Sequence, residues 1–479
     1  MLTSLRWIMS APLTLLRVSF PSRAAAVKGR SCGLANVLCG ALFALLAATA
    51  GPAMAQSVLY VRPAAAPAGD GRSWATAYQH PQQALAYCTA NPGTRQVWIA
   101  AGTYTPDQTG MDRTKSFVAV ANVTLLGGFA GTEAELWQRS PTGNITILSG
   151  LYAGGARAHR VVRSTNVTGV AFNRLTITKG QSDGDPTDER GSGARVSGGN
   201  VTFTLCEFID NGKAAVALVN APHGGAIAIS GSATVTLIDC LFQGNRAGQG
   251  IGGEPDISPF VGGHGGAISV ESSTLTATRT TFIANLAGAG GTGRCVAGTP
   301  TAATAAGNGG AVWANSATVT FNDCQFVGNR AGRPATGATC RNSDGGHTAS
   351  GNGGAIATTS TQVTINRCRF VDNATRDGHP ADCPFVSTPR VDSKGGDGGA
   401  LHLVNSPANI YNSLIVGNRA GAGGLGVTCE ATAPPGTDGK GAGIFNGGSS
   451  TSHAMQLVNC TIASNFNATA ATPAGLAGA

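Results

Sequence analysis

The sequence has few charged and few aromatic side chains, and it has no acidic residue before Asp70. Charged residues make up 12% and aromatic residues 6% of the 479 positions, a composition that does not suit a bundle of helices. Glycine is abundant, with 70 residues, and 42% of the chain is hydrophobic. That hydrophobic share is enough to bury a core, so a folded, glycine-rich and repetitive protein is expected.

Motifs that carry catalysis or hold cofactors are missing as well. The sequence contains no glycine-rich phosphate-binding loop, no cysteine and histidine spacing of a zinc site, and no pattern of a nucleophilic triad. No cofactor is therefore expected. The formal net charge of +8 comes mainly from residues 1–55, so it does not indicate a nucleic-acid partner.

The N-terminal segment predicts export. Basic residues without acidic ones precede the apolar run 34–50, and Ala53 and Ala55 fit the small-residue rule of a cleavage site. We therefore assign residues 1–55 to a signal peptide, which makes Gln56 the first residue of the mature chain. An uncleaved membrane anchor is the alternative, although the apolar run is short for a membrane span.

Two short motifs alternate along most of the mature chain. One is Gly-Gly-Ala followed by an aliphatic residue, and it starts at Gly224, Gly265, Gly309, Gly353 and Gly398. The other has a cysteine or another small residue, then an apolar residue two positions later, and an asparagine three positions after that. The asparagines are Asn211, Asn245, Asn285, Asn329, Asn373, Asn418 and Asn465.

The sequence between the motifs predicts the architecture. Segments such as ATVTLIDCLF alternate apolar and polar residues, which is typical of strands with one buried face. The variable insertions lie between each asparagine and the next Gly-Gly-Ala. Stacked coils of short strands with insertions at one corner describe an all-β, right-handed parallel β-helix, that is, a solenoid.

Each repeated position has a structural role in such a coil. The cysteine and phenylalanine positions point inward, and the asparagines fit a turn that enters the left-handed region, with amides bonded between coils. The inward columns are Cys206, Cys240, Cys324, Cys368 and Cys460, and Phe208, Phe242, Phe282, Phe326 and Phe370.

The chain divides into four parts. The signal peptide is followed by residues 56–130, an N-terminal cap with the first coils, in which the segment from His80 predicts a short capping helix. Residues 131–465 are the β-helix repeats with long loop insertions, and residues 466–479 are expected to be an unstructured tail. Such a tail leaves the last coil open, and self-association through this uncapped coil is expected.

The two motifs together resemble the repeats of polymorphic outer-membrane proteins and related bacterial right-handed β-helix surface proteins of the pectin-lyase-like superfamily. The start of the mature chain is similar to theirs as well, with LYVRPAAAPAGDGRSWATAYQHPQQALA, QVWIAAGTYTP and VTLLGGFAGTE. The resemblance implies a protein that is secreted or displayed on the outer surface of a bacterium, and that is often adhesive.

One outward column carries charge. The position before the cysteine is Asp239, Arg279, Asp323 and Arg367 in four successive coils. We interpret it as a charge ladder on a flat sheet that pairs neighbouring coils. The alternative is a polysaccharide-cleaving cleft, because Asp239 and Asp323 are two coils apart, about 9.6 Å, near the upper carboxylate separation of an inverting hydrolase.

Two other groups of polar side chains could act as ligands. Asp183, Asp185, Asp188 and Glu189 offer oxygen atoms to calcium, but the loop lacks the glycine and distal glutamate of an EF-hand, so a solvated loop is the favoured interpretation. His264 lies in a column of polar turn residues, and we assign it neither a metal nor a catalytic role.

Four cysteines lie at matching places in the insertions. Cys295, Cys340, Cys383 and Cys429 follow the asparagine of their coil by 10 or 11 residues. In an oxidising compartment this spacing predicts disulfides Cys295–Cys340 and Cys383–Cys429, with Cys340–Cys383 as the alternative.

These observations favour a non-catalytic scaffold or adhesin whose stacked insertion loops present a binding face. The alternative is a polysaccharide lyase or glycoside hydrolase that acts in a groove on the β-helix. Expected partners are a cell-surface glycan or a protein of a host or neighbouring cell, together with the outer membrane or the extracellular matrix.

Overall fold

The computed structural model describes residues 57–478 apart from 109, 141, 183–189, 213–220, 251–260, 293–294, 297–298, 301–302, 336–338, 341–342, 345–347, 380–392, 425–435, 449–453 and 468–475. The expected signal peptide lies outside the described residues. Within the described part of the chain, no helix is long and apolar enough to cross a membrane.

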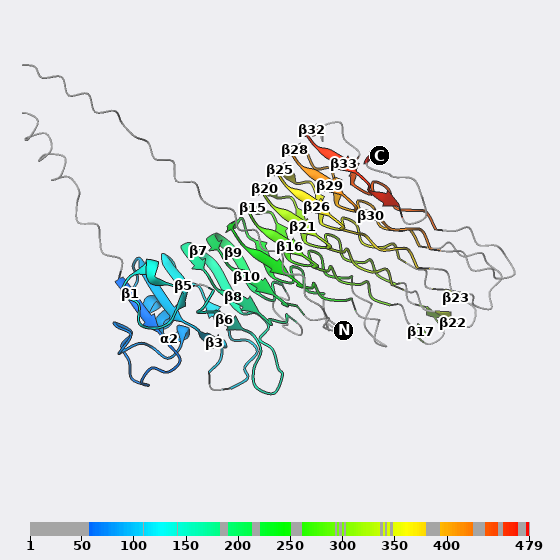
Figure 1. Cartoon of the computed structure of the whole chain (residues 1–479). Coiled ribbons are helices and arrows are strands. Elements are labelled where there is room, and N and C mark those ends of the chain that lie inside the picture. Colours follow the sequence, from blue (N-terminus) through cyan, green and yellow to red (C-terminus); the bar gives the residue numbers. More distant parts are fainter. Residues whose placement is uncertain are drawn as a thin grey trace, which may run out of the picture. The chain divides into compact units, whose positions relative to one another are not determined.

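The body of the protein is a right-handed parallel β-helix, which confirms the predicted fold class (Figure 1). Each coil contributes three short strands that pair in parallel with those of the next coil. One coil contains β11 (Ile227–Ser230), β12 (Thr234–Ile238) and β13 (Leu241–Gln243), and the next contains β14 (Ile268–Glu271), β15 (Thr274–Thr278) and β16 (Thr281–Ile283).

The strands form three faces, which we call the first-strand, second-strand and third-strand faces. Later coils add β19 (Val312–Asn315), β24 (Ile356–Thr359), β27 (Leu401–Val404) and β31 (Ile444–Gly447) to the first. They add β20 (Thr318–Asn322), β25 (Gln362–Asn366), β28 (Ala408–Tyr411) and β32 (Met455–Val458) to the second. The third gains β21 (Gln325–Val327), β26 (Arg369–Val371), β29 (Leu414–Val416) and β33 (Thr461–Ala463).

The earlier coils are less regular. The strands β7 (Val162–Asn173) and β9 (Ala194–Thr204) each run through the first-strand and second-strand faces without a break. The other early strands are β1 (Ser57–Val61), β2 (Arg95–Ala100), β3 (Gly102–Tyr104), β4 (Phe117–Val118), β5 (Val123–Phe129), β6 (Thr146–Ser149), β8 (Thr176–Thr178) and β10 (Glu207–Ile209), with a 3-10 turn η1 (Leu136–Gln138).

A helix packs beside the first strands. Helix α2 (Pro81–Ala90) starts after His80, whose side chain accepts a hydrogen bond from the Gln82 backbone N–H, and Pro81 fits the first helical turn. Its buried residues Ala84, Leu85 and Cys88 belong to the same apolar core as the strands.

The residues expected to form an unstructured tail contain two short strands. Strand β34 (Phe466–Asn467) pairs with β30 (Arg419–Ala420), and β35 (Leu476–Gly478) pairs with β31. The edge of β31 presents unpaired backbone groups, and pairing with β35 satisfies them.

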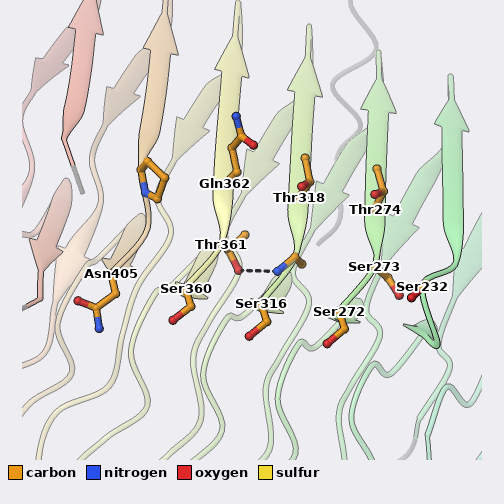
Figure 2. A pocket seen from close by; sticks show the side chains of 12 residues that line it. Ser232, Ser272, Ser273, Thr274, Ser316, Thr318, Ser360, Thr361, Gln362 and Asn405 are labelled. Carbon is orange, nitrogen blue, oxygen red and sulfur yellow. Dashed lines mark hydrogen bonds between the residues drawn. The ribbon is translucent and has the colours of Figure 1, made fainter. Parts of the chain in front are cut away.

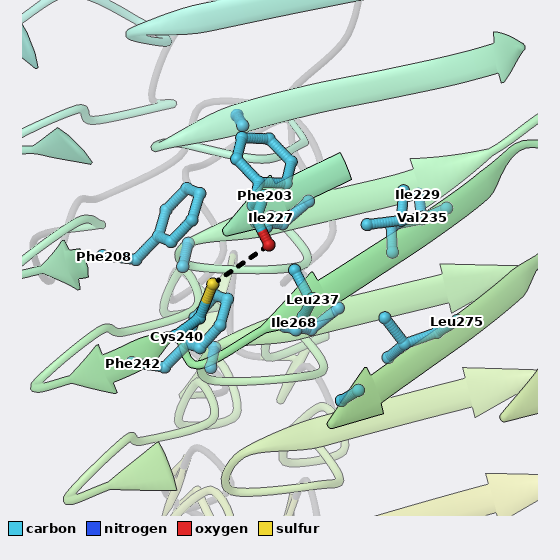
Figure 3. Close-up of a cluster of buried hydrophobic side chains, with 14 of the residues drawn as sticks. Phe203, Phe208, Ile227, Ile229, Val235, Leu237, Cys240, Phe242, Ile268 and Leu275 are labelled. Carbon is cyan, nitrogen blue, oxygen red and sulfur yellow. Dashed lines mark hydrogen bonds between the residues drawn. The ribbon is translucent and has the colours of Figure 1, made fainter. Parts of the chain in front are cut away.

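The core is built from columns of identical positions. Phe242, Phe282 and Phe326 are fully buried and lie in register, with ring centroids 5.0 and 4.7 Å apart. Burying each ring contributes about 1.5–3 kcal/mol. The cysteine thiols lie beside the rings, and the Cys240 thiol donates to the Phe203 carbonyl at 3.4 Å (Figure 3).

The asparagine column forms a continuous ladder. The Asn285 side-chain amide donates to the Oδ1 atom of Asn329 at 2.9 Å, and the same oxygen accepts the Asn285 backbone N–H at 3.0 Å. The left-handed residue precedes the asparagine, as at Ala284 with φ 51° and Gly328 with φ 63°. It is not the asparagine itself, because the amide must point inward to reach the next coil.

The insertions are not free loops where they join the coils. We call the residues just after each asparagine the outgoing limb and those just before each Gly-Gly-Ala the incoming limb; Figure 1 shows these limbs side by side, running away from the strands. Backbone bonds pass alternately between them, from Gly288 N to Gly263 O (2.8 Å), from Gly307 N to Gly288 O (2.8 Å) and from Gly332 N to Gly307 O (2.9 Å). A Cβ atom on Gly307 would lie 2.0 Å from the Gly263 oxygen, so the contact requires glycine.

Candidate functional site

A groove of about 670 Å³ follows the corner where the first strand of each coil turns into the second. Figure 2 shows the equivalent side chains of successive coils in a row along it. The groove is lined by Ser232, Ser272, Ser273, Thr274, Ser316, Ala317, Thr318, Ser360, Thr361, Gln362, Asn405 and Pro407. Every polar group in this lining is a hydroxyl, an amide or backbone, and none is ionisable.

The corner geometry explains the row of hydroxyls. Ser272, Ser316 and Ser360 have φ between 46° and 51°, so each occupies the left-handed position of its turn and points its side chain outward. The residue after each of them points inward and has a structural role: the Thr361 hydroxyl accepts the Ala317 backbone N–H at 3.4 Å. The outward hydroxyls of Ser272, Ser316 and Ser360 have no hydrogen-bond partner among the described residues and are therefore available to a ligand.

The groove continues onto a flat, uncharged surface. On the second-strand face, five threonines lie in register and are partly exposed, namely Thr202, Thr236, Thr276, Thr320 and Thr364. Since neighbouring strands are about 4.8 Å apart, the face repeats one hydroxyl pattern per coil. This arrangement can form hydrogen bonds with a repetitive ligand, but it holds no acid or base for catalysis.

The charged column borders the opposite edge of the second-strand face. The Arg279 guanidinium donates to both carboxylate oxygens of Asp239, at 2.7 and 2.8 Å, and Arg367 holds Asp323 in the same way at the same distances. These four residues have φ between 47° and 55°, so they lie in the turn after the second strand and not on a flat sheet, which corrects that part of the prediction. The coil must turn there to begin the third strand.

The ion pairs determine the protonation of the two carboxylates. The hydrogen bonds from Arg279 lower the pKa of Asp239, and those from Arg367 lower the pKa of Asp323. Both side chains therefore remain deprotonated near neutral pH. A general acid of a glycoside hydrolase needs the opposite, a carboxyl group with a raised pKa.

The column that contains His264 forms a second ladder, from side chain to backbone. The Nδ1 atom of His223 accepts the His264 backbone N–H at 2.8 Å, and the Nδ1 atom of His264 accepts that of Asn308 at 2.9 Å. Burial lowers the pKa of His264 to about 4, and its ring stacks on Trp313 at 4.7 Å. The ladder continues through the side chains of Asn308, Asn352 and Asp397 to the backbone of Lys440.

Several predicted site residues are not described structurally. The calcium candidates Asp183, Asp185, Asp188 and Glu189 lie outside the described residues, as do Cys383 and Cys429. Cys295 lies in β17 (Cys295–Val296), which pairs with β18 (Thr299–Pro300), and Cys340 lies in β22 (Thr339–Cys340), which pairs with β23 (Ser343–Asp344). Neither side chain is described, so the disulfides stay a prediction. No group of metal-binding side chains occurs among the residues described.

The groove was not predicted from the sequence, although its residues occur at a regular position in the repeats. Ser272, Ser316, Ser360 and Asn405 each lie seven positions after the first glycine of their Gly-Gly-Ala motif. A constant offset of a small polar residue between two alternating segments indicates a turn. It does not indicate that the side chains of successive turns line one groove.

Comparison with known proteins supports the fold. A family model described as "Right handed beta helix region" matches residues 150–352, which is less than half of the chain. No curated protein sequence matches this chain. The chain is therefore a right-handed β-helix protein by its architecture and by this match.

Three solved structures that resemble this chain come from proteins with different functions or sources. ORF18 of Geobacillus virus E2 is 13% identical with a TM-score of 0.24; the match covers 92% of this chain and 66% of that one, just under two thirds of its length. An endo-xylogalacturonan hydrolase from Aspergillus tubingensis is 10% identical, with 88% and 93% covered and a TM-score of 0.27. A rhamnogalacturonan lyase is 12% identical, with 84% and 85% covered and a TM-score of 0.26. With TM-scores this low, these similarities carry no information about substrate or activity.

Proposed function

We propose that the chain is a non-catalytic scaffold, secreted or held at the outer surface of a bacterium, and that its groove and threonine face bind a glycan. The groove lining carries the proposal, because it offers the hydroxyls of Ser272, Ser316 and Ser360, which have no partner among the described residues, over several coils without an ionisable group. Such groups recognise sugar hydroxyls by hydrogen bonds. The insertion loops, whose tips lie outside the described residues, are the second binding face of this scaffold.

The repeat of the coil favours an extended ligand. Each coil advances about 4.8 Å and presents the same hydroxyl pattern again. A polymer that lies along the axis of the β-helix meets equivalent groups in each coil, so weak contacts add along its length.

The alternative, a polysaccharide lyase or hydrolase, has less support. Its strongest candidates, Asp239 and Asp323, each have both oxygens bonded to an arginine, and their pKa values are lowered. Those contacts suit a structural ladder and oppose the role of a proton donor.

A panel of neutral glycans tests the proposal. The exported chain should bind a member of the panel and release neither new reducing ends nor unsaturated products from it. Thr318→Val keeps the shape of the side chain and removes its hydroxyl from the groove, so it should weaken binding several-fold. The matched control Thr281→Val changes a partly exposed threonine on the third-strand face and should bind as the unmodified chain does. Equal binding by both variants, or product formation, would overturn the proposal.

A further inference from the structure

One arginine interrupts the column of glycines in the outgoing limbs. Gly248, Gly288, Gly332 and Gly421 hold equivalent places in four coils, but Arg376 stands there in the coil between Gly332 and Gly421. Its carbonyl accepts the Gly396 N–H at 3.1 Å, in the same way that the Gly332 carbonyl accepts the Gly351 N–H at 3.1 Å. A Cβ atom on Gly332 would lie 2.0 Å from the Gly288 oxygen, so a larger residue at this place forces the limbs to adjust.

The Arg376 side chain is only partly satisfied. It is half-buried, and its Nε atom is buried without a hydrogen-bond partner. Leaving a buried charged donor unpaired destabilises the folded state. Glycine, which neighbouring coils have at this place, would avoid the unpaired buried donor, so stability alone does not explain why this coil has an arginine.

Other positive charges surround Arg376. Burial lowers the pKa of its guanidinium, and the charges of Arg330, Arg333 and Arg419 lower it further, while the charge of Asp377 raises it. Arg330 and Arg419 pair with Ala374 from the two neighbouring coils, so the two arginines flank the segment that leads to Arg376. The four arginines thus belong to three successive outgoing limbs.

The nearby carboxylate does not neutralise the cluster. The Arg419 Nη2 atom donates to both oxygens of Asp377, at 2.7 and 2.8 Å, and one of these oxygens also accepts the Ala422 backbone N–H at 2.8 Å. Arg330 and Arg333 are exposed and have no ion-pair partner among the described residues. Within the described residues, Arg330, Arg333 and Arg376 therefore form no ion pair, although the charge of Asp377 acts on Arg376 and raises its pKa.

We propose that Arg330, Arg333 and Arg376 form a binding site for a tetrahedral oxyanion, the sulfate or phosphate ester group of a glycan. A carboxylate offers two oxygens, and one arginine can contact both, as the Nη2 atom of Arg419 contacts both oxygens of Asp377. Three guanidinium groups from neighbouring limbs suit an anion with three terminal oxygens. The site lies on the insertion side of the coil, and it does not depend on the glycan groove.

Binding to dextran sulfate and to unsulfated dextran tests this site, with inorganic sulfate and phosphate as small probes. The full exported chain should bind dextran sulfate and not dextran, and both small anions should raise its Tm; the stronger of the two identifies the ester. Arg376→Gly restores the glycine of the other coils. It should keep or raise the Tm without ligand, and it should weaken dextran sulfate binding about tenfold, as expected for the loss of one charge-assisted contact.

Two further variants separate a specific site from general charge. Arg246→Gln removes an exposed arginine from the same column in an earlier coil, where the next coil has Leu286 at this position, and it should leave binding unchanged. The double variant Arg330→Gln and Arg333→Gln changes only exposed side chains and should lose binding more than tenfold. Equal losses in Arg246→Gln and Arg376→Gly would overturn the proposal. So would equally tight binding of polygalacturonate, which carries carboxylates instead.

Discussion

The side-chain amide of Asn285 donates to the Oδ1 atom of Asn329, 2.9 Å away in the next coil, and to the carbonyl of Phe242, 3.0 Å away in the previous one. One buried side chain thus connects three coils. Both asparagines are fully buried, so water cannot replace any of these bonds.

Asn329→Ala should therefore destabilise the protein strongly. The substitution leaves two donors of Asn285 and the Phe282 carbonyl without their bonds, and we expect a loss of about 3–5 kcal/mol in the free energy of unfolding. Urea unfolding measures the loss. Asn322→Ala is the matched control, because that asparagine is partly exposed and its side chain makes no hydrogen bond within the described residues; a similar loss in both variants would contradict the role of the ladder.

The histidine ladder predicts lower stability in acid. Burial lowers the pKa of His264 from 6.5 to about 4, so the folded state keeps the ring neutral while the unfolded chain takes up a proton. The stability contributed by this histidine is complete above pH 6.5 and falls as the pH drops from 6.5 toward 4. At pH 4.5 the loss should be about 2 kcal/mol.

His264→Asn should remove this part of the pH dependence. Asparagine fills the equivalent place at Asn308 and Asn352, where its side-chain oxygen accepts the same type of backbone bond. Urea unfolding at pH 7.5 and pH 4.5 should show the variant close to the parent at the higher pH and more stable than the parent at the lower one. An unchanged difference between the two pH values would show that another group is responsible.

Gly307, in an incoming limb, should not tolerate a side chain. Gly307→Ala places a Cβ atom 2.0 Å from the Gly263 oxygen, and we expect a loss of more than about 3 kcal/mol or failure to fold. Gly328→Ala is the control, since its Cβ would meet nothing within 4 Å and alanine already occupies the equivalent left-handed position at Ala284. That control should lose about 1 kcal/mol, measured by the same unfolding curves.

The cysteines of the insertions should be oxidised in the exported protein. We expect bonds Cys295–Cys340 and Cys383–Cys429, each closing a loop long enough to stabilise the fold by about 3–4 kcal/mol through restriction of the unfolded chain. Peptide mapping without reductant identifies the pairs. Recovery of all four as thiols would rule out these bonds and the alternative Cys340–Cys383, while the buried Cys240 and Cys324 should stay reduced and serve as internal controls.

Much of the fold was predictable because its determinants are local and repeated. The alternation of apolar and polar residues defines which side chains point inward, and the motifs at Gly265 and Asn285 mark where a coil begins and where its third strand ends. The pattern predicts that Phe282 faces the core, because the alternation of its neighbours in the sequence defines the buried side of the strand, and Phe282 is fully buried.

The charged column and the groove, in contrast, depend on contacts between residues some 40 positions apart in the sequence. The sequence showed that aspartate and arginine alternate in this column, but only the stacking of the coils decided that each aspartate pairs with the arginine that follows it, so that neither Asp239 nor Asp323 is free to act as an acid. The hydroxyls of Ser316 and Ser360 likewise form one groove only after the coils are in register. The sequence by itself determined the coil, because a strand or turn follows from neighbouring residues. Tertiary structure decided the surface, because Arg330 and the segment that contains Ala374 and Arg376 become neighbours only when successive coils pair, which the local sequence of neither limb determines.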